Sequence, residues 1–350
     1  MSGGASNVAN PIGLDGIDFV EFSTSEPKTM TKLFEQFGFR HVANHKSKKI
    51  ELYRQGDVNF LLNTETKCFA ADFRKAHGPS ICSMGFRVKD QNAAIREATA
   101  RGARQFENQT ATTFAVPTMY GIGDSLVYFV DTYGSKGSLF ESEFDWLSND
   151  HQHKGFGYTM VDHLTNNVPA GKMQEWCDFY TKIFGFTERR YFDIRGKKTG
   201  LISKVMASAD GKICIPINEP TDKKSQIQEY LDEYKGPGIQ HLALLTSDIC
   251  PSVARVREQG VQFLDVPDTY YEMLHERVPN VTEKTDRLRE LKILVDGDKG
   301  GYLLQIFTKN IVGPIFFEVI QRKGHDGFGD GNFQALFDAI ERDQMQRGVV

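Results

Sequence analysis

The chain has 350 residues, of which 40% are hydrophobic and 25% are charged, and its formal net charge is −4. This length predicts two domains, and the ordinary globular composition excludes a wholly disordered chain. The charge balance argues against nucleic acid or a membrane as a partner, and no stretch reaches the about 20 apolar residues of a membrane span.

The N-terminal residues 1–11 are rich in Gly, Ser, Asn and Ala. They lack the charged and then apolar pattern of a signal peptide, so we expect a disordered tail. Five cysteines are spread along the chain, and no two are closer than 14 residues. This spacing excludes CxxC redox and zinc motifs and argues against a disulfide framework, so we expect a cytoplasmic protein.

The first half of the chain predicts a strand, a helix and then further strands. The first strand lies around residues 16–19, and Met30, Leu33 and Phe34 have the spacing of a helix behind it. Apolar and β-branched runs bounded by Gly, Pro and Asp predict the rest. These later segments are a strand from residue 78, a helix over 90–102, and strands at 126–129 and 139–140.

A polar stretch over residues 145–157, rich in Asn, Asp, His and Gly, is typical of a linker. The same order of elements recurs after it, which indicates an internal repeat. The repeated segments are a strand at 160–163, a helix ending at 179–186, a strand from residue 236, a helix over 248–260, and strands at 304–307 and 315–317.

This repeat predicts an α+β protein of two cupped sheets built from βαβββ modules, in domains 12–150 and 151–350. A final helix is expected from about Asn332, which can cap it. Phe328 stands among glycines just before that helix, which predicts a hinge and a lid over the site. The apolar face of the helix consists of Phe333, Leu336, Phe337 and Ile340, with Phe333 and Leu336 facing the substrate.

Three polar residues interrupt apolar strands of the second half, where an unpaired side chain is costly. They are His163, His241 and Glu318. Either histidine alone is explained more simply as a hydrogen-bonded core residue. The three together are the donor set of the facial triad in non-haem Fe(II) oxygenases, although zinc accepts the same ligands.

The first half carries the same architecture without the two histidines. Phe19 stands at the position of His163, and Ser83 stands at the position of His241. Glu141 lies about one residue away from the position that corresponds to Glu318. We therefore expect one active domain and one degenerate domain.

The second half resembles the 4-hydroxyphenylpyruvate dioxygenase family. The similarity covers this half in order, and the first half resembles the degenerate domain of the family more loosely. The matching stretches are VDHLT (161–165), PINEP (216–220), KSQIQ (224–228), GIQHLA (238–243), LLQIFT (303–308), FEVIQR (317–322) and GFGDGNF (327–333).

The resemblance implies a vicinal-oxygen-chelate fold and Fe(II) held by His163, His241 and Glu318. Because Gln240 directly precedes a ligand on its strand, its side chain points to the opposite face unless the backbone is kinked. The polar residues implied to act on the substrate are Ser203, Asn218, Gln226 and Gln305. The other pocket residues implied are Pro216, Gln240, Phe307, Phe316, Phe328, Asn332, Phe333 and Leu336.

The implied reaction converts 4-hydroxyphenylpyruvate and O₂ to homogentisate and CO₂ in tyrosine and phenylalanine catabolism. It combines oxidative decarboxylation, ring hydroxylation and migration of the side chain. The substrate carries its own 2-oxo acid, so no 2-oxoglutarate is expected. The resemblance also implies a homo-oligomer, with a tetramer favoured over a dimer.

Three alternatives stay open at this point. A 4-hydroxymandelate synthase would attack the benzylic carbon of the same substrate, and Pro216, Asn218 and Phe333 favour attack on the ring instead. An extradiol dioxygenase would act on a catechol and would not need the glutamine-rich pocket. A non-catalytic binding module of the same fold would need no buried triad.

Overall fold

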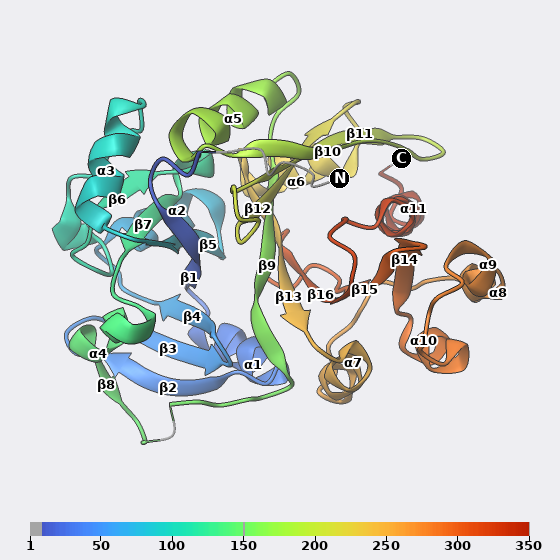
Figure 1. Ribbon diagram of the computed structural model, residues 1–350, viewed down its shortest axis with the longest axis horizontal. Helices are drawn as coiled ribbons and strands as arrows, with labels where there is room; N and C mark the ends of the chain where they lie inside the picture. The colour runs from blue at the N-terminus through green and yellow to red at the C-terminus, as the bar shows by residue number, and fades with distance from the viewer. Residues whose placement is uncertain (1–8, 150, 350) are drawn as a thin grey trace, which may run out of the picture.

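The computed structural model describes residues 9–149 and 151–349, so most of the tail predicted over residues 1–11 lies outside the described residues. The chain forms two eight-stranded sheets side by side, one from each half (Figure 1). In spatial order the first sheet contains β6 (Thr118–Tyr120), β7 (Leu126–Val130), β5 (Ser80–Val88), β1 (Leu14–Ser23), β4 (Val58–Asn63), β3 (Ile50–Gln55), β2 (Arg40–His45) and β8 (Phe144–Trp146).

The second sheet repeats this arrangement around its own central strand. Its spatial order is β10 (Thr187–Arg195), β11 (Gly200–Ala207), β12 (Cys214–Pro220), β9 (Tyr158–Asn167), β13 (Gly238–Thr246), β16 (Phe316–Lys323), β15 (Gly301–Phe307) and β14 (Leu294–Asp298). β1 pairs antiparallel with β5 and parallel with β4, just as β9 pairs with β13 and β12. The predicted α+β class with two repeated curled sheets is confirmed.

Helices cover the outer faces and ends of the sheets. The first half contains α1 (Pro27–Gln36), α2 (Phe69–His77), α3 (Gln91–Ala100) and α4 (Leu139–Glu143). The second half contains α5 (Met173–Phe179), which continues as a π-helical turn (Tyr180–Phe184), α6 (Gln226–Tyr234), α7 (Ile249–Glu258), α8 (Thr269–Glu272), α9 (Leu274–Arg277), α10 (Thr285–Leu291) and α11 (Asp330–Gln346). Within the described ranges, no helix combines the length and the apolar character needed to cross a membrane.

Four expectations about the elements were wrong. We expected β7 to correspond to β15. By position in the sheet it corresponds to β16, because β7 pairs parallel with β5 just as β16 pairs parallel with β13. The strand expected at residues 139–140 is the start of α4, where the Ser138 hydroxyl caps the helix by accepting from the Phe140 N–H. Residues 145–146, expected in the linker, belong to β8 and pair with β2.

The fourth error concerns the final helix, which begins two residues earlier than expected. Gly329 is its N-cap, with a positive φ of 70°, and Asn332 lies inside the first turn. A side chain at position 329 would collide with the Gln305 amide, since a Cβ there would lie 2.5 Å from Oε1. The helix start is therefore set by close approach to β15, and the Asn332 side chain is released for another contact.

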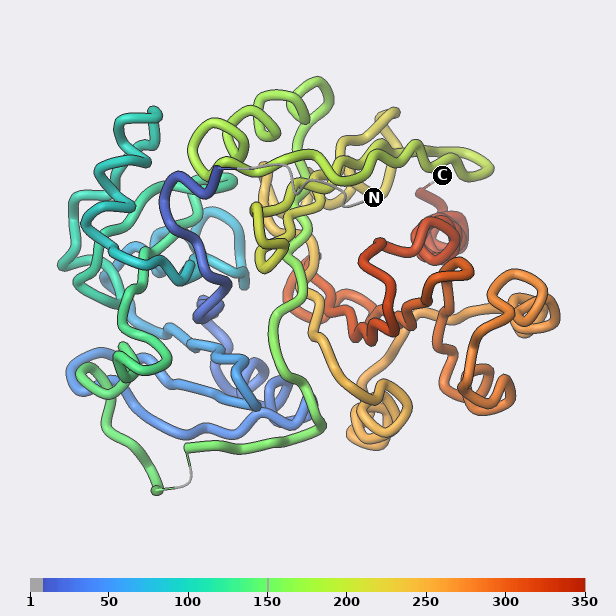
Figure 2. The backbone as a smooth tube through the Cα atoms, in the orientation of Figure 1, coloured from blue at the N-terminus to red at the C-terminus, as the bar shows by residue number. Residues whose placement is uncertain are grey.

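A shared aromatic core joins the two halves, which the backbone trace shows as blue-green and yellow-red bodies in contact (Figure 2). The ring of Phe317 on β16 lies 5.1 Å from Phe37 and 6.0 Å from both Phe22 and Phe60 of the first half. Part of the phenylalanine surplus therefore serves this joint. The next residue of β16, Glu318, faces the interior of the second sheet.

Candidate metal centre

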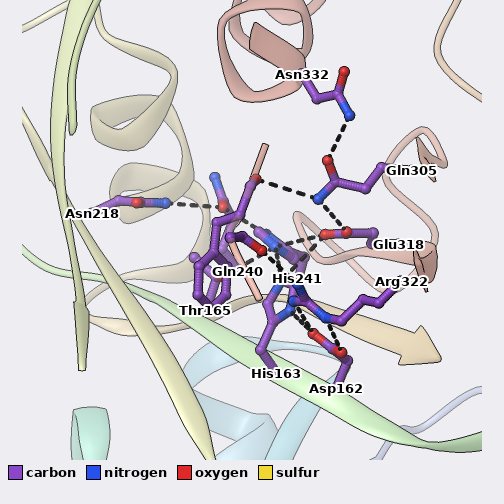
Figure 3. Close-up of polar contacts among 12 residues, drawn as sticks. Asp162, His163, Thr165, Asn218, Gln240, His241, Gln305, Glu318, Arg322 and Asn332 are labelled. Carbon is purple, nitrogen blue, oxygen red and sulfur yellow. Dashed lines mark hydrogen bonds and ion pairs between the residues drawn. The ribbon is translucent and has the colours of Figure 1, made fainter. Parts of the chain in front are cut away.

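Three buried side chains from neighbouring strands meet inside the second sheet (Figure 3). Nε2 of His163 lies 3.2 Å from Oε2 of Glu318, and Nε2 of His241 lies 3.5 Å from the same oxygen. The two Nε2 atoms are 3.3 Å apart. In the described part of the chain, this is the one group of three or more potential metal-ligating side chains whose ligand atoms lie within 4.8 Å of one another.

Strand register explains why these residues meet. Ala243 on β13 lies opposite His163 on one side and Glu318 on the other. His241 is two residues earlier on β13, so it points to the same face as Ala243. The small alanine side chain between the ligands leaves the centre of the cluster open.

The second nitrogen of each imidazole has a partner that orients the ring. Nδ1 of His163 donates to Oδ2 of Asp162 at 2.8 Å, and Nδ1 of His241 donates to Oε1 of Gln240 at 3.0 Å. The Thr165 hydroxyl donates to Nε2 of His241 at 2.9 Å. Rings that donate from Nδ1 offer Nε2 as the ligand atom, and such outer contacts are usual around metal-binding histidines.

The electrostatics of the cluster favour a bound cation. Burial disfavours the charged form of His163, but the Glu318 and Asp162 carboxylates outweigh it and raise the pKa of His163 to about 9. Burial also acts against ionised Glu318, but the two histidines outweigh it and lower the pKa of Glu318 to about 2. The pKa of His241 is lowered, chiefly by burial. A carboxylate, a neutral imidazole and a second imidazole that can release its proton fit a divalent metal ion.

The cluster opens onto a small cavity with free space of about 30 Å³. This volume has room for about two water molecules. Eight of the predicted pocket residues line the cavity: Ser203, Pro216, Asn218, Gln305, Phe307, Phe328, Phe333 and Leu336. Three further lining residues were missed in the sequence, namely Thr165, Phe192 and Val205. Thr165 and Val205 each lie two positions after a predicted site residue on the same strand, so period-two alternation could have found them.

Two buried polar atoms in this cavity have no partner in the described structure. They are Oγ of Ser203 and Oδ1 of Asn218. These residues lie opposite each other in the register of β11 and β12. Because an unpaired buried polar atom is costly, this pair of strands is prepared to receive a polar group of a ligand.

The structure does not bring the remaining predicted residues into the cavity. Gln226, Gln240 and Phe316 line a separate cavity of about 300 Å³. The kink required for Gln240 is present, since the register of β13 shifts between Ile239 and His241. Oε1 of Gln240 accepts a hydrogen bond from Nδ1 of His241. The ring of Phe316 stacks on the His241 ring at 4.7 Å. Both residues therefore contact the His241 ring without lining the metal cavity.

Gln305 connects the cluster to α11. Its Nε2 donates to Oε1 of Glu318 at 2.9 Å, and its Oε1 accepts from Nδ2 of Asn332 at 2.9 Å. The Tyr270 hydroxyl donates to Oδ1 of Asn332 at 2.8 Å. Asn332, expected as a helix cap and as a pocket residue, instead supports Gln305 from the first turn of the helix (Figure 3).

Helix α11 lies over the cavity, as the lid prediction required. Phe333 and Leu336 line it, and the Phe333 ring lies 5.4 Å from the ring of Phe192 on β10. Further along the helix, the buried Glu341 carboxylate accepts the backbone N–H groups of residues 197–199 at 2.7–2.9 Å. This contact fastens α11 to the turn between β10 and β11.

Among the described residues of the first half there is no equivalent cluster. The register places Phe19 and Tyr128 on either side of Gly85, as His163 and Glu318 flank Ala243. Ser83 corresponds to His241, as expected, but Tyr128 and not Glu141 corresponds to Glu318. The aromatic rings that fill this first cup are Phe19, Phe114, Tyr128, Phe140 and Phe144.

Comparison with known proteins identifies the family. Residues 8–145 match the model described as "Hydroxyphenylpyruvate dioxygenase, HPPD, N-terminal". Residues 160–306 match the "Glyoxalase/Bleomycin resistance protein/Dioxygenase superfamily" model. The chain is 52% identical over 342 residues to Protein MelA of Shewanella colwelliana, covering 97% of this chain and 99% of that protein.

Two further relatives bear on the activity. A 4-hydroxyphenylpyruvate dioxygenase of Legionella pneumophila is 49% identical over 344 residues, covering 97% of this chain and 98% of that protein. A solved structure of a mutant 4-hydroxymandelate synthase from Streptomyces coelicolor has a TM-score of 0.83 at 26% identity, covering 95% of this chain and 99% of that one. The expected vicinal-oxygen-chelate fold is confirmed, and the chain belongs to the 4-hydroxyphenylpyruvate dioxygenase family.

Proposed function

We propose that this protein is a 4-hydroxyphenylpyruvate dioxygenase, which converts 4-hydroxyphenylpyruvate and O₂ to homogentisate and CO₂. One observation carries the proposal: the buried cluster of His163, His241 and Glu318 opens onto a cavity walled by phenylalanines and containing unpaired polar atoms. Four bacterial relatives that bear this name are 45–49% identical over nearly the whole chain.

His163, His241 and Glu318 would hold Fe(II). With three protein donors, the metal ion would keep coordination positions for a 2-oxo acid and O₂. Bound Fe(II) supplies the redox chemistry with O₂ that protein side chains cannot perform. The protein's own part is to bind, orient and enclose the substrate.

The cavity walls suit an aromatic substrate with a polar end. Phe307 on β15 and Phe333 on α11 offer apolar faces for the ring. Ser203 and Asn218 can hydrogen-bond the phenol hydroxyl, because their free oxygens face the same space. Neutral amide and hydroxyl groups hold a phenol without adding charge. Gln305 holds the Glu318 carboxylate in place and can turn its amide toward the substrate.

Helix α11 excludes water from the reaction. The cavity beneath it has about 30 Å³ of free space, which is too little for a substrate with an aromatic ring and a three-carbon side chain. The helix or the adjoining segment that carries Phe328 therefore moves for the substrate to enter, and it closes again to keep the reacting groups dry.

We further propose that residues 151–350 form the catalytic domain and residues 12–150 a degenerate one. The rings that fill the first cup support this division, because Phe19 and Tyr128 stand where the second half has His163 and Glu318. The sequence resemblance supports the finer expectations: a role in tyrosine and phenylalanine catabolism, a cytoplasmic location and a homo-oligomer, with a tetramer favoured over a dimer. Light scattering of the purified protein tests the oligomeric state.

The deciding experiment measures O₂ uptake by the Fe(II)-loaded protein with 4-hydroxyphenylpyruvate and no 2-oxoglutarate, and identifies the product by NMR. We expect homogentisate from the wild type and from the surface control His275→Ala, and none from His163→Ala. 4-Hydroxymandelate as the product would keep the metal centre and overturn the ring chemistry. Absence of O₂ uptake by the iron-bound protein would overturn the proposal that 4-hydroxyphenylpyruvate is the substrate.

A further inference from the structure

Arg322, near the end of β16, contacts Asp162, the partner of the cluster residue His163, and the segment that leads into α11. Its guanidinium forms a bidentate pair with Asp162, with Nε to Oδ1 and Nη2 to Oδ2 both at 2.8 Å. Oδ2 of Asp162 also accepts from Nδ1 of His163 at 2.8 Å. The side chains of Arg322 and Asp162 are 19% and 9% exposed, so solvent screens this pair only weakly.

The internal repeat shows what Asp162 is for. In both halves the register of the central strand shifts at this aspartate, which is Asp18 in the first half. Arg87 pairs with Oδ1 of Asp18 at 2.8 Å, but Oδ2 of Asp18 has no hydrogen-bond partner among the described residues. The histidine is missing there, because Phe19 takes its place. The second oxygen of the aspartate is therefore used only where a histidine ligand must be oriented.

The other side of Arg322 grips the segment that leads into α11. Nη1 donates to the carbonyl oxygen of His325 at 3.2 Å and to that of Gly327. The guanidinium also lies 5.3 Å from the centre of the Phe328 ring, in cation–π contact. Glycines with positive φ stand at both ends of this segment, 69° at Gly324 and 70° at Gly329. The segment thus has hinge-like ends and is held in the middle by one side chain.

Phe328 is the wall that this grip holds in place. Its ring lies 5.4 Å from the His163 ring, edge to face. The same side chain lines the metal cavity on one side and an open cleft of about 820 Å³ on the other. Arg322 and Asp162 line the cleft as well. Displacement of Phe328 would therefore connect the metal cavity with solvent.

We propose that Arg322 is a positioning residue that couples the orientation of the metal ligand His163 to the closure of the segment 324–329. The guanidinium holds Asp162, and Asp162 fixes the His163 imidazole. The same guanidinium also holds the backbone carbonyl groups of the segment that places Phe328. Metal binding and closure then stabilise each other through the same side chain. This inference rests on the metal centre of the proposed function, but not on the identity of the substrate.

The test uses the full-length protein without substrate and two readouts. The first is the affinity for Fe(II) and, separately, for Zn²⁺, measured by competition with a chelator. The second is hydrogen exchange of residues 324–332 with and without the metal. Arg322→Gln removes the grip, Arg322→Lys keeps the charge without the fork, and Asp162→Asn breaks the link to His163. The matched control is Arg87→Gln, which removes the arginine that pairs with the corresponding aspartate, Asp18, in the first half.

We expect Arg322→Gln and Asp162→Asn to bind metal about 10–100-fold more weakly, the usual effect of losing an outer contact of a metal ligand. In the wild type the metal should slow exchange of residues 324–332, and in Arg322→Gln exchange should be several-fold faster and independent of the metal. Arg322→Lys should retain only part of both effects. The double variant with both Arg322→Gln and Asp162→Asn should bind metal no more weakly than the worse of the two single variants.

Two outcomes would overturn the proposal. One is a loss of thermal stability in Arg322→Gln like that in Arg87→Gln, with metal affinity and metal-dependent exchange unchanged. The other is additive loss of metal affinity in the double variant, which would mean that the two residues act separately. Neither readout depends on turnover, so a failure of the proposed reaction would be recognised separately from a failure of this coupling.

Discussion

Asn332 donates from its Nδ2 atom to Oε1 of Gln305 at 2.9 Å, and this contact ties the first turn of the lid helix to the side chain that holds Glu318. Asn332→Ala leaves a buried amide oxygen without its donor, which costs about 1–3 kcal/mol of stability. We expect faster hydrogen exchange at the start of α11 and a lower kcat/KM. Asn92→Ala, at an exposed position in the first turn of α3, is the control and should change neither quantity.

Glu341 predicts how the lid responds to pH. Burial alone would raise its pKa, but the backbone N–H groups of residues 197–199 and the Thr199 hydroxyl outweigh burial and hold the pKa below its ordinary value of 4.5. A lowered pKa stabilises the closed helix above pH 4.5, and this contribution is lost as the pH falls below that value. The protection factors of α11 amides, which are corrected for the pH dependence of intrinsic exchange, should therefore fall below pH 4.5.

Glu341→Gln should lower the protection factors in α11 at neutral pH and remove most of their further fall in acid. Glu258→Gln, an exposed change at the end of α7, serves as the control. An unaltered pH profile in Glu341→Gln would mean that another group controls the helix.

Ser203 predicts a separation of stability from activity. Its buried hydroxyl oxygen has no partner in the described structure, so Ser203→Ala should leave thermal stability unchanged or slightly raised. We expect kcat/KM to fall by about tenfold, or about 1.4 kcal/mol, if the hydroxyl binds substrate. Ser252 donates to the Phe156 carbonyl oxygen at 2.7 Å, so Ser252→Ala should lower thermal stability and leave kcat/KM unchanged. Equal losses of stability in both variants would argue against a substrate contact at Ser203.

Metal binding should stabilise the fold. A ligand that binds only the native state adds ~2.7 kcal/mol at a free concentration of about 100 times Kd. Calorimetry should show a rise in Tm when Fe(II) or Zn²⁺ is added to the metal-free protein, and a chelator should reverse it. His241→Ala should lose this response, and His275→Ala, at an exposed histidine, should retain it. A rise of equal size in His241→Ala would place the bound metal elsewhere.

The cluster residues were predictable because each interrupts an apolar strand. A histidine or glutamate inside such a run must have a partner, and three of them in corresponding strands of one half indicated a shared site. The repeat also indicated correctly that Phe19 and Ser83 replace the two histidines. It failed for Glu318, since Tyr128 takes that position, because sheet order and not strand order along the chain decides which strands correspond.

Contacts between distant segments could not be predicted from local pattern. Arg322 and Asp162 are 160 residues apart, and either would pass for an ordinary charged residue at a strand end or on a strand. The start of α11 was misplaced for a similar reason. Asn332 is a good cap by residue type, but the close approach of Gln305 to Gly329 begins the helix earlier. Gln226 likewise faces a cavity whose position depends on how α6 and α11 pack.

Alternate side chains of β16 serve two different neighbours. Phe317 inserts into the aromatic core of the first half, and Glu318, one residue later, belongs to the metal cluster. A shift of one half against the other would therefore drag a ligand atom with it. The half without metal ligands thus holds β16 of the other half in a fixed position. The packed rings that fill its cup make it rigid enough for this role.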